Sequence, residues 1–366
     1  MSMHKTSAWP LALVYAGLIV YASLFPFAGW RDQGVTPWFF LTAPLPRYWT
    51  VFDVVANLVG YMPLGFFLVL SALRTGRPRF ALRLGVLAAL LLSLLMESLQ
   101  VYLPKRVPSN LDLMLNMAGG ALGAMSAWSL ERLGVLQRWS RFRAHWFVTD
   151  ARGGLVLLAL WPLALLFPVS IPLGLGQVFE RLQGKMAAVL ADTPFLQWLP
   201  MREATLQPLL PAMEWLCVVL GLLIPCLLGF CIIRKVGQRA WFVLWVCFFA
   251  IWASALSAAL SVGPEHAWAW LSAPVKAALM SAAVLALVLL RVPRRASAAL
   301  ALLALGVHLS LLNQTSVNPY FEQTLFLWEQ GRFIRFHGLV QWLGWLWPFA
   351  TLVYLLSLLW DKESKN

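Results

Sequence analysis

The sequence predicts an all-α, polytopic integral membrane protein, and three observations support this fold class. The chain of 366 residues is 61% hydrophobic and only 12% charged, whereas soluble domains carry about a quarter charged residues. About ten segments are long and apolar enough to cross a bilayer, and within lipid only helices satisfy the backbone groups of such segments. The 20 Trp and 22 Phe residues suit the aromatic belts at membrane interfaces.

The ten predicted helices follow one another along the chain. They are expected at about residues 9–28, 52–73, 80–103, 111–133, 153–173, 211–233, 240–262, 272–291, 295–312 and 337–360. We interpret the first run as a retained helix rather than a signal peptide, because it is long enough to span and no A-x-A cleavage site follows it. The run at 295–312 is short and could instead be a re-entrant segment.

The basic residues predict the orientation of these helices. With the N-terminus inside, 18 of the 28 Lys and Arg residues fall in inner connections, so the positive-inside rule places both termini in the cytoplasm. Because the basic residues are dispersed among short loops, the net charge of +13 indicates topology rather than binding to nucleic acid. We therefore expect a multi-pass protein of the cytoplasmic (inner) membrane.

The chain is expected to have two membrane regions and no soluble domain. Four helices within residues 1–133 form the first region, residues 134–152 form a basic cytoplasmic loop, and six helices follow in 153–366. The apolar spacing in 177–190 and the mixed character of 318–335 predict two segments that lie along the membrane interface.

Polar residues are scarce, and they gather between residues 53 and 123. Residues 53–60 and 112–119 both read Asp-x3-Asn-x2-Gly, a spacing that lies on one face of a helix. Between the two copies lie Glu97, Gln100 and Arg106. An internal duplication would relate two helix pairs about an axis along the membrane normal, as in some transporters.

The predicted topology places these polar groups together on the outer side. The catalytic candidates, as general acid or base, are Glu97, Asp112 and Asp53, and the ligand-binding candidates are Asn57, Gln100, Arg106 and Asn116. Ionisable groups in a membrane cost roughly 2.5–3.5 kcal/mol, so function is the default hypothesis. Glu97 lies deepest and is the best single candidate.

A structural interpretation stays open for the same residues. The aspartates could stabilise helix N-termini, and the amides and glycines could join helices. Arg106 could neutralise Glu97 or Asp112, or it could hold the phosphate or carboxylate of a ligand.

Motifs for metal or nucleotide chemistry are missing from the sequence. There is no H-E-x-x-H, G-x-S-x-G or Walker motif, and His266, His308 and His337 lie on separate helices. The four cysteines lie within or beside apolar runs and are expected to be core thiols rather than metal ligands or disulfides. We expect no cofactor and no metal.

The spaced polar residues resemble those of the VanZ-like family over about residues 10–130. The residues that carry this resemblance are Tyr21 to Phe27, Asp53, Asn57, Pro63 to Gly65, Glu97, Gln100, Arg106, Ser109, Asp112, Asn116, Gly119 and Gly123. The resemblance implies an integral membrane protein, and the family's named relative is associated with reduced teicoplanin susceptibility. It implies no particular reaction.

Three functions follow as hypotheses. The first, which we favour, is a non-enzymatic cell-envelope factor. It would affect glycopeptide susceptibility by binding membrane lipids or a lipid-linked cell-wall precursor. The second is a membrane enzyme acting on a lipid-linked glycan or phosphate. The third is a transporter of a lipid or small envelope precursor, suggested by the repeat and the number of helices.

Overall fold

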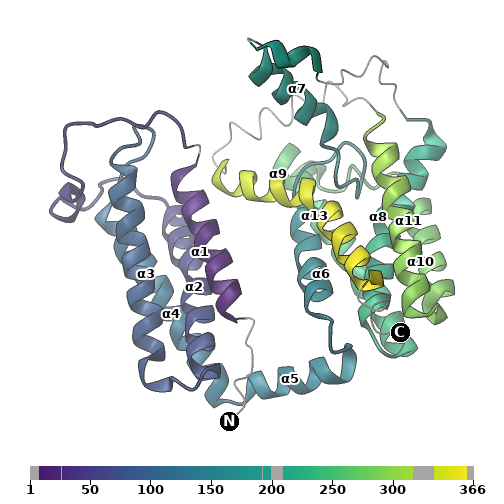
Figure 1. Ribbon diagram of the computed structural model, residues 1–366, viewed down its shortest axis with the longest axis horizontal. Helices are drawn as coiled ribbons and strands as arrows, with labels where there is room; N and C mark the ends of the chain where they lie inside the picture. The colour runs from purple at the N-terminus through teal and green to yellow at the C-terminus, as the bar shows by residue number, and fades with distance from the viewer. Residues whose placement is uncertain (1–7, 26, 192, 199–208, 316–333, 361–366) are drawn as a thin grey trace. The chain divides into compact units, whose positions relative to one another are not determined.

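The computed structural model describes residues 8–25, 27–191, 193–198, 209–315 and 334–360, and its regular structure is helical (Figure 1). One isolated antiparallel bridge joins Phe147 to Ile233. The chain divides into two compact units, Met1–Arg141 and Phe142–Asn366, which are described separately.

Seven of the described helices are long and apolar enough to cross a membrane. They are α2 (Val51–Arg74), α3 (Pro78–Gln100), α8 (Pro211–Ile232), α9 (Val236–Val262), α10 with its short extension η4 (Ala273–Val288 and Leu289–Arg291), α11 (Arg294–Leu312) and α13 (Ile334–Trp360). The chain is therefore an all-α, multi-pass membrane protein. The run at 295–312 belongs to this group, since α11 is 19 residues long.

Three expected spans are helical but fall outside this group. α1 (Ala8–Leu24) has 17 residues, and α4 (Asn110–Arg132) has 23 residues but contains glycines and polar residues that lower its hydropathy. α6 (Arg152–Ala164) has 13 residues, which is about 20 Å of helix against a hydrocarbon core of about 30 Å. The helix expected over 153–173 ends early, because Pro168 disfavours helical backbone at the residue before it.

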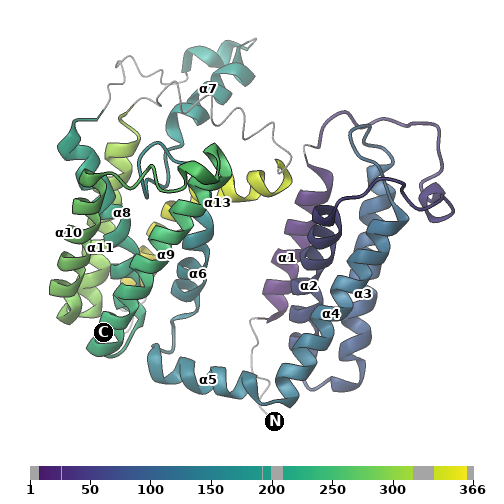
Figure 2. The same cartoon turned by 180° about the vertical axis from the view of Figure 1, so that it is seen from behind.

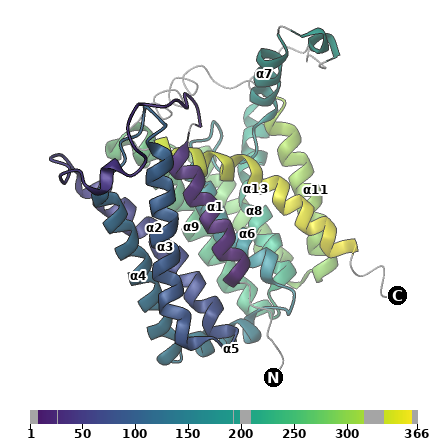
Figure 3. The same cartoon turned by 60° about the vertical axis from the view of Figure 1, so that its left-hand side comes forward.

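The first unit contains α1 to α4, which Figure 3 shows side by side. Its closest pair is α2 and α4, which meet at glycines. A Cβ atom on Gly119 or Gly123 would overlap the carbonyl oxygen of Leu58 or Met62 on the facing helix, and one on Gly65 would overlap α4 in the same way. Small residues thus let two backbones approach closely, as membrane helices commonly do.

The second unit is organised around α8, whose residues from Cys217 to Ile232 are all buried. α6, α9, α10 and α11 surround α8, and α13 packs on α6 and α11 (Figure 2). The buried side chain of Arg239 donates to four backbone carbonyls near the ends of α8 and α10. Arg239 therefore connects the ends of these helices, and backbone carbonyls accept hydrogen bonds from its guanidinium group.

Two connecting segments are helical. The stretch 134–152, expected as a basic loop, contains the helix α5 (Val135–Trp146), and α7 (Phe179–Leu190) lies within the predicted interfacial segment 177–190. Short 3₁₀ turns occur at Phe39–Leu41, Pro194–Trp198 and Pro264–His266. The other expected interfacial segment, 318–335, falls outside the described residues apart from its last two positions.

Candidate functional site

One face of α3 carries a stripe of buried polar side chains. Ser93, Glu97 and Gln100 are separated by four and three residues, so they lie on the same side of the helix. Their exposed fractions are 0%, 3% and 7%. α3 packs against α1, α2 and α4, so the stripe faces the interior of the first unit rather than lipid.

Glu97 joins α3 to the beginning of α4. Its carboxylate accepts the backbone N–H of Ser109, with the nitrogen 2.9 Å from Oε2. Ser109 is the N-cap of α4, and its hydroxyl accepts the N–H groups of Leu111 and Asp112 at 3.1 and 3.4 Å. The buried carboxylate therefore fixes the residue that starts the next helix.

Asn116 on α4 reaches the same stripe. Its Nδ2 donates to the hydroxyl of Ser93 over 2.9 Å. Its Oδ1 is buried and has no hydrogen-bond partner in the described part of the chain. The buried hydroxyl of Tyr61 on α2 faces the Ser93 hydroxyl but makes no hydrogen bond of standard geometry there. Tyr61 is 5% exposed and Asn116 is 4% exposed. We call Tyr61, Ser93, Glu97 and Asn116 the buried polar cluster.

Two groups in this cluster keep hydrogen-bonding capacity that a ligand can use. Tyr61 supplies a hydroxyl that can donate or accept, and Asn116 supplies a carbonyl acceptor. A buried polar atom without a partner costs about 1–3 kcal/mol. Such a cost is recovered when a group with both a donor and an acceptor enters the site.

Asp112 lies one turn before Asn116 on α4. Its side chain is half-buried and within electrostatic range of Tyr61. It is thus near the cluster, at the end of α4 that Ser109 caps.

Gln100 and Arg106 bind the C-terminal end of α1. Gln100 Nε2 donates to the carbonyl of Ser23 over 3.0 Å, and Arg106 Nη2 donates to the carbonyls of Ala22 and Phe25. The last carbonyls of a helix lack partners within it, and a cation there also opposes the negative end of the helix dipole. The sequence suggested a carboxylate or a ligand for Arg106 but not these carbonyls.

Asp53 and Asn57 are placed differently from their counterparts in the second motif. Asp53 is exposed and forms a capping box with Thr50, whose backbone nitrogen and hydroxyl donate to Oδ2 over 3.0 and 2.7 Å. This is the helix-stabilising role that the sequence left open. Asn57 is half-buried and makes no hydrogen bond to another described residue. The two copies of Asp-x3-Asn-x2-Gly therefore occupy unlike environments.

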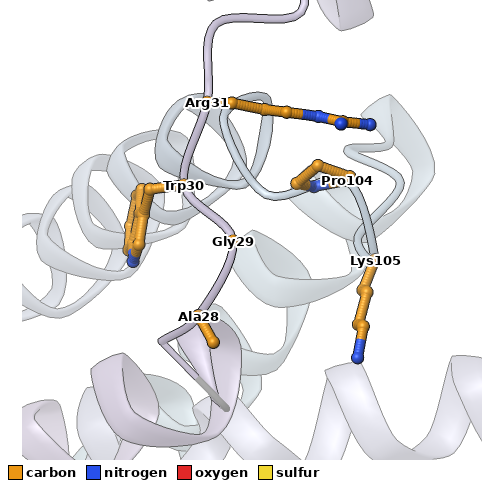
Figure 4. Close-up of a pocket in the computed structure, with 6 residues that line it drawn as sticks. All are labelled: Ala28, Gly29, Trp30, Arg31, Pro104 and Lys105. Atoms are coloured by element: carbon orange, nitrogen blue, oxygen red, sulfur yellow. The ribbon is translucent and has the colours of Figure 1, made fainter.

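A surface depression of about 370 Å³ lies at the end of α3. It is lined by Ala28, Gly29, Trp30, Arg31, Pro104 and Lys105 (Figure 4). Its walls are fixed because the Arg31 nitrogen donates to the carbonyl of Tyr102 over 3.0 Å and the Gln33 amide donates to that of Val101. Arg31 and Lys105 extend from the two sides of the depression in Figure 4, which makes it cationic.

Sequence reasoning missed Tyr61 and Ser93. Both have a signal in helical spacing, since Tyr61 follows Asn57 by four residues and Ser93 precedes Glu97 by four. A tyrosine or serine in an apolar helix is common, however, so the spacing alone does not distinguish them. Among the described residues no group of three His, Cys, Asp or Glu side chains is placed to hold a metal ion.

The fold and the cluster define a class: a multi-pass helical membrane protein whose first unit buries an incompletely hydrogen-bonded polar cluster. Residues 4–131 match the VanZ/LLP1 family model, so the N-terminal third of the chain is a VanZ/LLP1 domain. This confirms the resemblance that the spaced polar residues indicated. No curated protein and no solved structure matches the chain.

Proposed function

We propose that this protein is a cell-envelope factor whose VanZ/LLP1 domain binds the polar headgroup of an outer-leaflet lipid or lipid-linked cell-wall precursor. Through that binding it changes how glycopeptides such as teicoplanin act at the cell surface. The supporting observation is the buried Asn116 Oδ1, which has no hydrogen-bond partner among the described residues, in the same cluster as the Tyr61 hydroxyl. A hydroxyl or amide of a headgroup satisfies both, because it can accept from the phenol and donate to the amide oxygen.

Binding is favoured over catalysis by the surroundings of Glu97. Glu97 is 3% exposed, and its carboxylate accepts a backbone N–H of the α4 cap, which is a positioning contact. A general acid or base must instead reach the proton it transfers within hydrogen-bond distance. The cationic depression at Arg31 and Lys105 suits a phosphate on the ligand, and it lies at the end of α3, the helix that carries Ser93 and Glu97.

The proposed topology has ten membrane crossings with both termini in the cytoplasm of the producing cell. α6 is short, but the chain after it is buried in the second unit, with Ile171, Leu173 and Leu175 each less than 7% exposed. Non-helical backbone is tolerated at membrane depth where protein covers it. Reporter fusions after residues 76, 140, 236 and 293 should read cytoplasmic and those after 40, 190 and 325 external. A fusion that reads on the other side contradicts this topology.

Mass spectrometry of the purified full chain tests the proposed ligand. We expect a copurified lipid or glycan that is retained by the wild type and by Asp53→Asn, a variant of the exposed cap. Asn116→Leu keeps the side-chain size but removes the amide, so retention should fall at least about tenfold, the value of one lost hydrogen bond of about 1.4 kcal/mol. If Asn116→Leu and Asp53→Asn retained equal amounts of the copurified ligand, ligand binding at the buried polar cluster would be refuted.

The substitution Glu97→Gln tests whether the buried polar cluster is needed for glycopeptide tolerance in cells. The amide oxygen can still accept the Ser109 N–H, so we expect normal protein levels. Loss of glycopeptide tolerance at those levels would show that the negative charge of Glu97 is needed beyond its contact to the α4 cap. Loss of the protein itself would show that Glu97 is structural. Chemical change of the retained ligand on incubation would favour the enzyme, and its movement across proteoliposomes would favour the transporter.

A further inference from the structure

The helix α5 has the composition of a membrane-surface helix. Val135, Trp139, Phe142 and Trp146 recur at intervals of four, three and four residues, so they share one face. Arginines at 138 and 143 border this face, and the sequence of α5 contains no acidic residue. An apolar stripe with aromatic residues, bordered by arginine, is typical of helices that lie in the plane of a membrane interface.

The exposure of these side chains agrees with that pattern. The structure describes all twelve residues of α5, and none of them is buried. Trp139 is 53% exposed and Phe142 is 42% exposed. Phe142 packs on Trp146 with ring centroids 5.2 Å apart. More than two fifths of the surface of Trp139 and of Phe142 is therefore exposed.

Hydrogen bonds place the C-terminal end of α5 at the end of two spanning helices. The carbonyl of Trp146 accepts the N–H of Arg234 over 3.0 Å, and the carbonyl of Phe147 accepts Nε of Arg234 over 2.7 Å. The N–H of Val148 donates to the carbonyl of Ile232 over 2.9 Å. Because α8 ends at Ile232 and α9 begins at Val236, this end of α5 lies at a membrane boundary.

We propose that α5 is a lipid-binding surface that inserts Trp139 and Phe142 below the headgroups and binds acidic phospholipids with its arginines. Arg138, Arg141 and Arg143 are the headgroup contacts, and their long side chains reach the headgroups while the aromatic rings lie deeper. The charge of the helix selects this partner, since it has three arginines and no compensating acid within it. The inference is independent of the function proposed for the first unit.

Spin labels at neighbouring positions test the insertion. In a full chain with its four cysteines changed to alanine, we would label Trp139→Cys and Ser140→Cys, which lie on the apolar and polar faces. The chain is reconstituted in vesicles of phosphatidylglycerol and phosphatidylethanolamine. We expect the label at 139 to collide mainly with oxygen and the label at 140 mainly with a soluble nickel chelate.

Two other results overturn the insertion. Equal collision of both labels with the nickel chelate would place α5 in water. Shielding of the label at 139 from both reagents would show that protein, such as a second copy of the chain, covers this face instead of lipid.

Lipid retention tests the role of the charges. Native mass spectrometry of the detergent-solubilised full chain would measure bound phosphatidylglycerol relative to phosphatidylethanolamine. Each Arg→Gln change in α5 should lower this ratio about fivefold, which corresponds to about 1 kcal/mol for one cation at an anionic surface. Arg47→Gln, an exposed arginine before α2, is the matched control and should leave the ratio unchanged. An equal fall of the lipid ratio in the Arg47→Gln control would show that only net charge matters. It would refute a specific lipid-binding surface on α5.

Discussion

Adding a methyl group at Gly119 should destabilise the VanZ/LLP1 domain, whereas the same change at Gly60 should not. These glycines hold the same position in the two copies of Asp-x3-Asn-x2-Gly. A Cβ on Gly119 would overlap the carbonyl oxygen of Leu58 on α2, while a Cβ on Gly60 would meet nothing within 4 Å. Comparing the two variants therefore separates the effect of helix packing from the helix propensity of alanine, which both variants share.

The magnitude follows from two opposing terms. Replacing glycine by alanine inside a helix stabilises it by about 0.5–1 kcal/mol, and this term is shared by both variants. Overpacking costs about 1–3 kcal/mol and applies only at Gly119. The adjacent contact at Gly123 against Met62 keeps α4 from moving away at low cost. The variants should therefore differ in unfolding free energy by about 1–3 kcal/mol.

Thermal unfolding of the purified chain in one detergent measures this difference. Each kcal/mol shifts the melting temperature by about 2–4 °C in domains of 150–250 residues, so Gly119→Ala should melt several degrees below Gly60→Ala. The latter should equal or exceed the wild type. Identical melting temperatures, or a larger loss at Gly60, would refute the close approach of α2 and α4. A fall at both sites would instead indicate equivalent roles for the two copies.

Three further substitutions test single contacts by the same melting measurement. Arg106→Gln should cost about 1–3 kcal/mol, because half-buried carbonyls at the end of α1 lose their donor; an unchanged melting temperature would contradict this capping. Asn313→Ala should cost on the order of 3 kcal/mol, since its amide makes three hydrogen bonds to residues 176–179 at the start of α7 and one to Leu309 of α11. Trp347→Phe should cost about 1 kcal/mol, because its Nε1 donates to the carbonyl of Leu157 over 2.7 Å.

Local sequence accounts for much of the first unit. The Thr50 and Ser109 caps begin α2 and α4, and the apolar runs between such signals predict the helices within a few residues. The family resemblance also came from residues in a linear pattern. These features are readable because they depend on neighbours three or four positions away.

The hydrogen-bond partners of the polar residues could not be predicted from local sequence in the same way. Arg106 and Gln100 bind carbonyls of α1 that lie 77–84 residues away in the chain, and Tyr61 meets α3 and α4 only after the helices pack. A spacing pattern shows which face of a helix is polar. It does not show which helix covers that face.

The amino-acid sequence alone identifies a helical, multi-pass membrane protein with a VanZ/LLP1 domain. Its apolar composition favours a lipid environment, and the local spacing of its residues favours helices. Tertiary structure alone decided that Gly60 is open while Gly119 touches α2, that α6 ends at Ala164, and that Asp53 caps a helix away from the buried cluster. The physical reason is that close packing and hydrogen-bond satisfaction depend on groups distant in sequence, and identical local motifs can meet different neighbours.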